Sequence, residues 1–264
     1  MTVPEGPKLR KILALLALRS NQVVSCAEIM EELWGDEPPR TALPAIRTHL
    51  YHLRQAMRKE IGEKAAADLI GTRGVGYVFR AEPGQVDVES FRRLARRGED
   101  LMEVGRLTEG AWVLTKALDM WRGDALTDIA RGQLLEGHVR QLREIRTRAL
   151  RQRIQADLRL GRHGRVVVEL QGLMTAHTLD EPLHFQYITA LIRSGRRADA
   201  LLAYDGLRRS LRDELGLEPC RELQELQREI LSGMGVPRLP FGASVAEFMS
   251  RSLPKGDRHL SRVS

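Results

Sequence analysis

The spacing of hydrophobic residues predicts three helices within the first sixty residues. A short apolar run that follows basic positions predicts the first helix, over residues 8–18. Ser25 and Glu28 have the Ser-x-x-Glu spacing of a capping box, in which each residue satisfies a free backbone N–H at a helix start. We therefore expect a second helix from there to about Trp34, where Gly35 ends it.

The third helix, expected over residues 41–59, has two different faces. Four apolar residues at helical spacing form a stripe that would pack on the first two helices: Ile46, Leu50, Leu53 and Met57. The other faces carry side chains of the kinds that bind base edges and phosphates in a major groove: Arg47, Thr48, Tyr51, His52, Arg54, Gln55 and Arg58. Taken alone, this pattern fits a solvated helix face with ordinary charges equally well.

A glycine-rich segment over residues 69–79 predicts a β-hairpin. Strand-like ends flank a glycine turn with Arg73 at its tip, where the side chain is suited to enter a minor groove. A nucleotide-binding loop fits poorly, because the segment has no third glycine at the required distance, no following Lys-Ser/Thr pair and no helix after it. A hairpin with a purely structural role stays open. The long helix followed by this hairpin favours a DNA-binding winged helix.

The rest of the chain is predicted to be helical. The Glu-Pro-Gly break at 82–84 can continue neither a helix nor a central strand, so we divide the chain into a winged helix at 1–84, an all-α domain at 85–233 and a disordered tail at 234–264. A short helix around residues 245–249 would fit within the tail. Gly-Arg pairs stand between helical patterns at 105–106, 161–162 and 195–196, and the last two are separated by the tetratricopeptide period. The first spacing requires an insertion, and a bundle without repeats is the alternative.

Net charge adds little to this interpretation. The chain carries +7, which favours nucleic acid or an anionic membrane only weakly. Residues 1–85 hold 12 Lys and Arg against 10 Asp and Glu, so the surplus is not concentrated in the predicted winged helix. No apolar run approaches the roughly 18 residues of a membrane span. The two cysteines match no disulfide spacing, and we expect a cytoplasmic protein without membrane contact.

Two other classes of protein compete with a DNA-binding regulator. An enzyme fits poorly, because the seven histidines have no Cys or carboxylate set at ligand spacing and no Gly-x-Ser-x-Gly motif occurs. We therefore expect no catalytic residue, no metal and no cofactor. A tetratricopeptide-like scaffold that binds peptides but not DNA is the second class. Within the DNA-binding class, residue chemistry alone does not distinguish an activator from a repressor.

Several separated motifs resemble one family. Leu33-Trp34-Gly35 at a helix end, Leu53-Arg54 in the long helix and Gly74-x-Gly76-Tyr77 in the hairpin resemble the winged helix of response-regulator output domains, the OmpR type. Residues 32–40 and 51–54 are more similar still to the Streptomyces antibiotic regulatory proteins. Downstream, four segments resemble that family's bacterial transcriptional activation domain: residues 87–91, 117–126, 194–196 and 208–219. The resemblance covers residues 4–232 in order.

The resemblance implies an activator of antibiotic or other secondary-metabolite biosynthesis. Such a protein binds direct repeats in double-stranded promoter DNA, recruits RNA polymerase, acts as a homodimer on DNA and works at the nucleoid. The helical domain would support dimer formation. Family members begin with a small N-terminal sheet, so either the start of this chain lies too far downstream or the domain lacks those strands. With no receiver attached, control by phosphorylation of a fused receiver is not supported.

The resemblance also assigns residues by matching position. Thr48, Tyr51, His52 and Gln55 would read bases, and Arg47, Arg54 and Arg58 would hold phosphates. The wing would place Thr72, Arg73 and Gly74 at the minor groove. The loop between the second and third helices would contact polymerase through Gly35, Asp36, Glu37 and Arg40.

Overall fold

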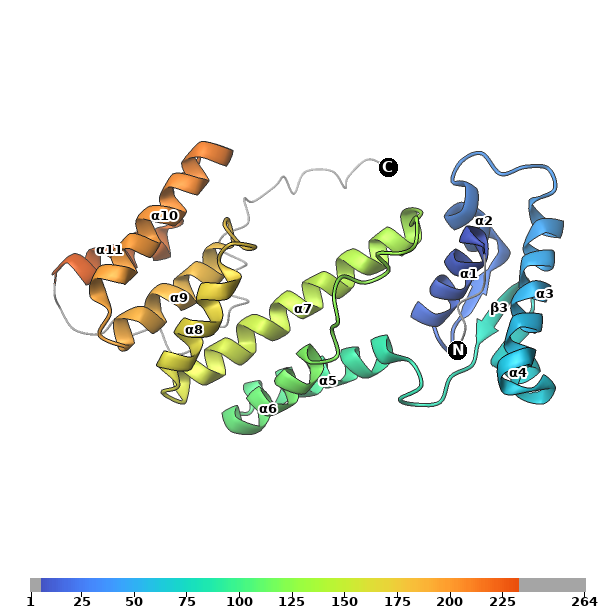
Figure 1. Cartoon of the computed structure of the whole chain (residues 1–264), viewed down its shortest axis with the longest axis horizontal. Helices are drawn as coiled ribbons and strands as arrows, with labels where there is room; N and C mark the ends of the chain where they lie inside the picture. The colour runs from blue at the N-terminus through green and yellow to red at the C-terminus, as the bar shows by residue number, and fades with distance from the viewer. Residues whose placement is uncertain (1–5, 233–264) are drawn as a thin grey trace, which may run out of the picture. The chain divides into compact units, whose positions relative to one another are not determined.

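A computed structural model describes residues 6–232 of the chain (Figure 1). The described residues form two compact units. The first runs to Asp100 and includes Trp112–Leu150, and the second takes Leu101–Ala111 with the described residues from Arg151 on. The tail expected at 234–264, with its short helix, lies outside the described residues. The domain division at residue 84 stays a prediction.

The N-terminal part folds as a winged helix, as expected. Its elements follow in the order α1 (Pro7–Leu18), β1 (Val23–Ser25), α2 (Cys26–Trp34), α3 (Ala42–Ile61), α4 (Glu63–Leu69), β2 (Ile70–Arg73) and β3 (Gly76–Phe79). The capping box is present, because the Ser25 hydroxyl accepts the Glu28 backbone N–H and the Glu28 carboxylate accepts that of Ser25. The three predicted helices and the hairpin are confirmed, each within two residues.

Two elements of the winged helix, β1 and α4, were not expected from the sequence. β1 pairs antiparallel with β3, with Val24 opposite Tyr77, so the sheet has the order β1-β3-β2. Three residues are too few for an alternating pattern to predict a strand. The pairing depends on Gly76, because a Cβ at this position would lie 2.3 Å from the Val24 carbonyl oxygen.

The apolar stripe of α3 lies at the centre of this core. None of Ile46, Leu50, Leu53 and Met57 is more than 2% exposed. α3 packs against both α1 and α2, and α1 contributes buried leucine and isoleucine side chains from its own apolar face. Burial of one stripe leaves the opposite face of α3 in solvent, and this face is the one predicted to bind DNA.

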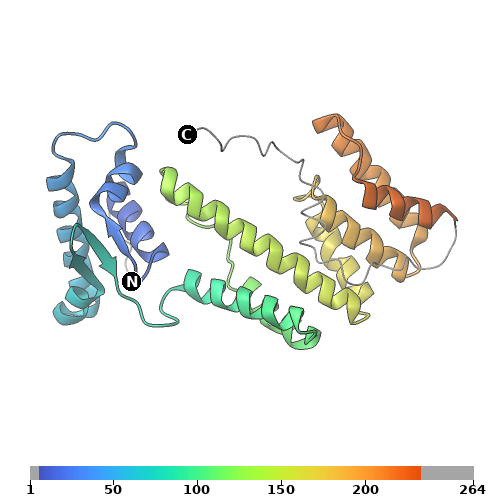
Figure 2. The ribbon, with the colours of Figure 1, turned by 180° about the vertical axis from the view of Figure 1, so that it is seen from behind.

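The remaining elements are helices, most of them joined by short connections, with a longer segment between α6 and α7. They are α5 (Asp87–Glu103), α6 (Leu107–Leu118), α7 (Gln133–Arg159), α8 (His163–Leu173), α9 (Glu181–Arg193), α10 (Arg197–Leu215) and α11 (Arg221–Ser232). Within the second unit, α8, α9 and α10 pack in succession (Figure 2). The expected all-α, tetratricopeptide-like class is confirmed.

The three Gly-Arg pairs form the same turn. Gly105, Gly161 and Gly195 have φ angles of +76°, +76° and +77°, which glycine adopts without the steric cost that a Cβ adds. In each case the next residue donates its backbone N–H to the carbonyl five residues earlier in the preceding helix. The first spacing is longer because the segment between α6 and α7 and the long α7 lie between the first and second turns.

Candidate DNA interface

The polar face of α3 carries an exposed aromatic pair. Tyr51 is 58% exposed, and the rings of Tyr51 and His52 meet edge to face with centroids 5.6 Å apart. Thr48 is exposed and Gln55 half-buried on the same helix. The Thr48 hydroxyl donates to the Pro44 carbonyl at 3.1 Å, so its oxygen keeps only acceptor capacity for a ligand. All four residues expected to read bases therefore share one helix and are at least partly open to solvent.

The basic residues of α3 differ in what they contact. Arg47 is exposed, and among residues 6–232 it makes no hydrogen bond or ion pair. Arg58 forms an ion pair with Glu63 at 2.5 Å, and the Glu63 side chain is largely exposed. An exposed pair of this kind adds little stability and opens at low cost. Of these two arginines, Arg47 is available to a ligand as it stands, and Arg58 becomes available when its pair opens.

Arg54 joins the recognition helix to the wing. Its Nε and Nη2 donate to the Ile70 carbonyl at 3.1 Å and 2.8 Å, and Nη2 also donates to the Thr72 hydroxyl at 3.2 Å. The guanidinium lies 5.9 Å from the centroid of the Tyr77 ring. From the sequence, Arg54 was grouped with the phosphate contacts. Its partner is a backbone carbonyl, and no residue type identifies such a partner in the sequence.

The wing ends in a two-residue turn, Gly74-Val75. Arg73 pairs with Gly76 in the β2–β3 register and is exposed, and among residues 6–232 it has no hydrogen-bond or ion-pair partner. The Val75 carbonyl accepts the N–H of Cys26 at 3.1 Å, which ties the turn to the start of α2. The Val75 side chain is 81% exposed. Its backbone anchor holds the tip in place while the side chains of Arg73 and Val75 extend from it.

Val75 was missed by sequence reasoning. A valine between two glycines at a hairpin turn cannot pack into the core, so its position in the sequence indicates an exposed apolar side chain. Proteins that bind the minor groove frequently insert apolar side chains between base steps. Arg73 and Val75 thus give the wing tip one exposed cationic and one exposed apolar side chain.

The α2–α3 loop, residues 35–41, is exposed throughout. Gly35 ends α2 with φ +60°, a conformation that other residues rarely adopt. Asp36 and Glu37 follow, then two prolines and Arg40. The loop therefore presents acidic side chains and a basic one to solvent, on a segment that the prolines restrict.

Other kinds of site find no support in the described part of the chain. Within residues 6–232, no three His, Cys, Asp or Glu side chains lie close enough together to hold a metal ion. Across the same residues, no helix has the length and apolar character that a membrane span requires.

Two protein families match the chain in the expected order. The family described as "Transcriptional regulatory protein, C terminal" matches residues 2–79. The family described as "Bacterial transcriptional activator domain" matches residues 86–231.

Individual relatives are regulatory proteins. The chain is 39% identical over 251 residues to the regulatory protein DnrI of Streptomyces peucetius, and the match covers 92% of each chain. It is 38% identical over 227 residues to the regulatory protein AfsR of Streptomyces coelicolor, covering 86% of this chain but 22% of AfsR.

A solved structure has the same fold. Mycobacterium tuberculosis EmbR, in complex with a low affinity phosphopeptide, matches with a TM-score of 0.81 at 28% identity. The match covers 94% of this chain and 64% of that of EmbR, so this chain spans less than two thirds of EmbR.

Proposed function

The chain belongs to the Streptomyces antibiotic regulatory protein family of DNA-binding transcriptional activators, and we propose that it activates a secondary-metabolite gene cluster from direct repeats near promoters. The observation that carries the proposal is the combination, in one winged helix, of an exposed Tyr51–His52 pair with Arg47 and Arg73, two cations without a hydrogen-bond or ion-pair partner among residues 6–232. Base edges and phosphates are the natural partners of these groups. We propose that the protein works in the cytoplasm at the nucleoid.

We assign the roles within α3 from the donors, acceptors and charges that each side chain keeps available for DNA. Tyr51 and His52 contact base edges. Thr48 accepts from an exocyclic amino group or touches a thymine methyl, because its own proton is engaged by the Pro44 carbonyl. Gln55, which is half-buried on the same helix, makes a further base contact. Arg47 holds a phosphate, joined by Arg58 when the ion pair with Glu63 opens.

We assign the wing a second set of contacts. Arg73 enters the minor groove, with Thr72, Gly74 and Val75 placing it there. Arg54 acts as a brace between α3 and the wing, because its donors are engaged by the Ile70 carbonyl and the Thr72 hydroxyl. This assignment replaces the phosphate contact expected from the family resemblance.

We propose that RNA polymerase is recruited through the α2–α3 loop, by way of Gly35, Asp36, Glu37 and Arg40. All four are exposed, and they differ in charge, which suits an electrostatic contact with a protein surface. Direct repeats place two bound copies head to tail, so we propose a homodimer on DNA in which the helical domain holds the copies together in that arrangement.

The test is binding to promoter fragments of the gene cluster that surrounds the gene, with genome-wide mapping of bound sites to define the repeats. Tyr51→Ala and His52→Ala should each lose roughly 1–3 kcal/mol of affinity with relaxed specificity. Arg47→Ala should weaken binding to all sequences alike and reduce the slope of log affinity against log salt by about 0.9. Absence of DNA binding from low to moderate salt would instead support a peptide-binding scaffold.

A further inference from the structure

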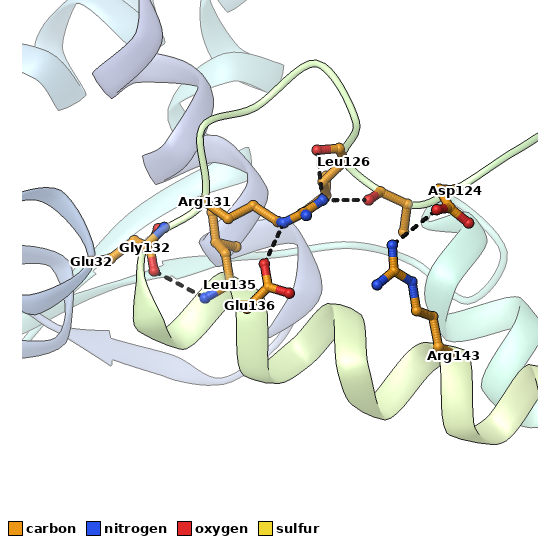
Figure 3. A network of polar contacts seen from close by, with 9 residues as sticks. Glu32, Asp124, Leu126, Arg131, Gly132, Leu135, Glu136 and Arg143 are labelled. Carbon is orange, nitrogen blue, oxygen red and sulfur yellow. Dashed lines mark hydrogen bonds and ion pairs between the residues drawn. The ribbon is translucent and has the colours of Figure 1, made fainter. Parts of the chain in front are cut away.

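A buried carboxylate joins the end of α2 to the start of α7 (Figure 3). Glu32 belongs to the winged helix, yet it is only 2% exposed. One of its carboxylate oxygens accepts the backbone N–H of Gly132 at 2.5 Å, and the other accepts that of Leu135 at 2.9 Å. The two partners lie about a hundred residues further along the chain, so the contact links the winged helix to the helical domain.

The carboxylate supplies a cap that α7 lacks. α7 begins at Gln133, so Gly132 is the residue that precedes the helix and Leu135 is the third residue within it. The first N–H groups of a helix have no partner in the helix, and the side chain before it normally accepts from the third residue. Gly132 has no side chain to do so. Glu32 takes that role from another element, with its charge at the positive end of the helix dipole.

The end of α2 lies so close to Gly132 that a larger residue would not fit there. A Cβ at position 132 would lie 2.4 Å from the backbone carbonyl oxygen of Glu32 and 2.7 Å from its carboxylate. Glycine is therefore required at the contact for a reason independent of the missing cap. Arg131 fixes the preceding segment, since it donates to the carbonyls of Ala125 and Leu126 and pairs with Glu136 at 2.6 Å (Figure 3).

Weaker contacts surround this buried one. Lys11 donates to the Glu32 carbonyl at 3.4 Å, and Arg10 lies 3.8 Å from the carboxylate of Asp128. Arg92 of α5 donates to the Leu18 carbonyl at the end of α1 at 3.2 Å. The Arg10–Asp128 pair is exposed and tolerates movement, and the bonds from Lys11 and Arg92 are only part-buried. A buried carboxylate with two backbone donors does not tolerate movement, because separation would leave charge and donors unsatisfied. Glu32 is thus the contact that sets the geometry.

We propose that Glu32 is a positioning residue, which fixes the α2–α3 loop and the winged helix relative to the start of the activation domain. Glu32 lies three residues before Gly35, where the loop leaves α2. The loop's contact with polymerase rests on the proposed function. The DNA-binding side chains lie on α3 and the wing and take no part in the Glu32 contact. Loss of this contact therefore lowers activation far more than promoter affinity.

The experiment disrupts the contact by a substitution at each of its two partners, Glu32 and Gly132. Glu32→Gln keeps the size of the side chain but replaces one accepting oxygen with an NH₂ group. This group is a donor, so it cannot accept from a backbone N–H. Gly132→Ala pushes the same surfaces apart through its Cβ. Glu31→Gln, at the exposed neighbouring position, is the matched control. For each full-length variant we would measure promoter affinity by fluorescence anisotropy and transcript from the same promoter with purified polymerase.

Both single variants should give about tenfold less transcript, within the usual range of coupling between two sites, and affinities within about twofold of wild type. The double variant should be no worse than the stronger single variant, since either change already removes the contact. Equal losses of affinity and transcript would show a purely structural role and overturn the proposal. So would additive effects, or transcript that stays at the level of the Glu31→Gln control.

A hydrogen-exchange measurement tests the same contact without DNA. Glu32→Gln should speed amide exchange in the first turn of α7 and in the α2–α3 loop, while β2 and β3 keep their protection. Faster exchange confined to α7 would overturn the proposal. If wild-type protein failed to bind promoter DNA, the proposed function would fail, and this exchange pattern would still decide whether Glu32 couples the two segments.

Discussion

Arg54→Lys keeps a positive charge on α3 but removes the fork that joins α3 to the wing. The guanidinium makes three hydrogen bonds, two of them to the Ile70 carbonyl, and a lysine ammonium, which is a compact point charge, cannot reproduce this planar fork. Hydrogen bonds from charged donors contribute about 1.5–3 kcal/mol each, and the bond to the exposed Thr72 hydroxyl contributes less. We expect a loss of about 2 kcal/mol in the free energy of unfolding, or a Tm lower by about 4–8 °C.

The salt dependence of DNA binding distinguishes a brace at Arg54 from a phosphate contact. A brace neutralises no phosphate, so Arg54→Ala should weaken promoter binding through the displaced wing and leave the slope of log affinity against log salt unchanged. Arg47→Ala should reduce that slope by about 0.9. The two variants would be compared in one anisotropy titration over salt, alongside thermal unfolding of Arg54→Lys. The brace is refuted if Arg54→Lys melts like wild type and Arg54→Ala reduces the slope as Arg47→Ala does.

Three further predictions concern local features. Gly76→Ala places a Cβ against the Val24 carbonyl and should lower the free energy of unfolding by about 2–3 kcal/mol. The control, Gly137→Ala, lies in open space on α7 and should raise the free energy of unfolding by roughly 0.5–1 kcal/mol. Similar effects of the two variants would contradict the close approach of β1. Ser25→Ala should cost about 1 kcal/mol by removing the cap of α2, and unchanged thermal unfolding would contradict it. Hydrogen bonds from two arginines lower the pKa of Glu218 to about 2, so its contribution to stability is complete above its unfolded pKa near 4.5 and is lost as pH falls toward 2. Glu218→Gln should therefore lose that pH dependence, and parallel pH profiles for both proteins would exclude the effect.

Features that depend on neighbours in the sequence were predictable. The buried stripe of α3, the capping box of Ser25 and Glu28 and the Gly-Arg turns all follow from local spacing, and the structure places them as expected. In each case the residue and its partner lie within a few positions, or repeat at the helical period. Local geometry alone then determines the conformation.

Features that depend on distant backbone groups were not predictable. In the sequence Glu32 looks like any glutamate in a helix. It is nevertheless buried, and its carboxylate oxygens accept the backbone N–H groups of Gly132 and Leu135. Arg54 is one of several basic residues on α3, and only the Ile70 carbonyl distinguishes it from Arg47. A backbone donor or acceptor is present at almost every position, so no residue type marks such a partner.

This distinction also explains why net charge gave no sign of the DNA-binding surface. The winged helix has nearly balanced charges, but its acidic and basic groups have different uses. Glu28 caps α2, where the Ser25 backbone N–H lowers its pKa, and Glu32 caps α7. Arg47 on α3 and Arg73 on the wing have no ion-pair partner in the described part of the chain, residues 6–232. Because the field at a DNA surface depends on which charges are free and where they lie, a segment with a small net charge can still present a basic face.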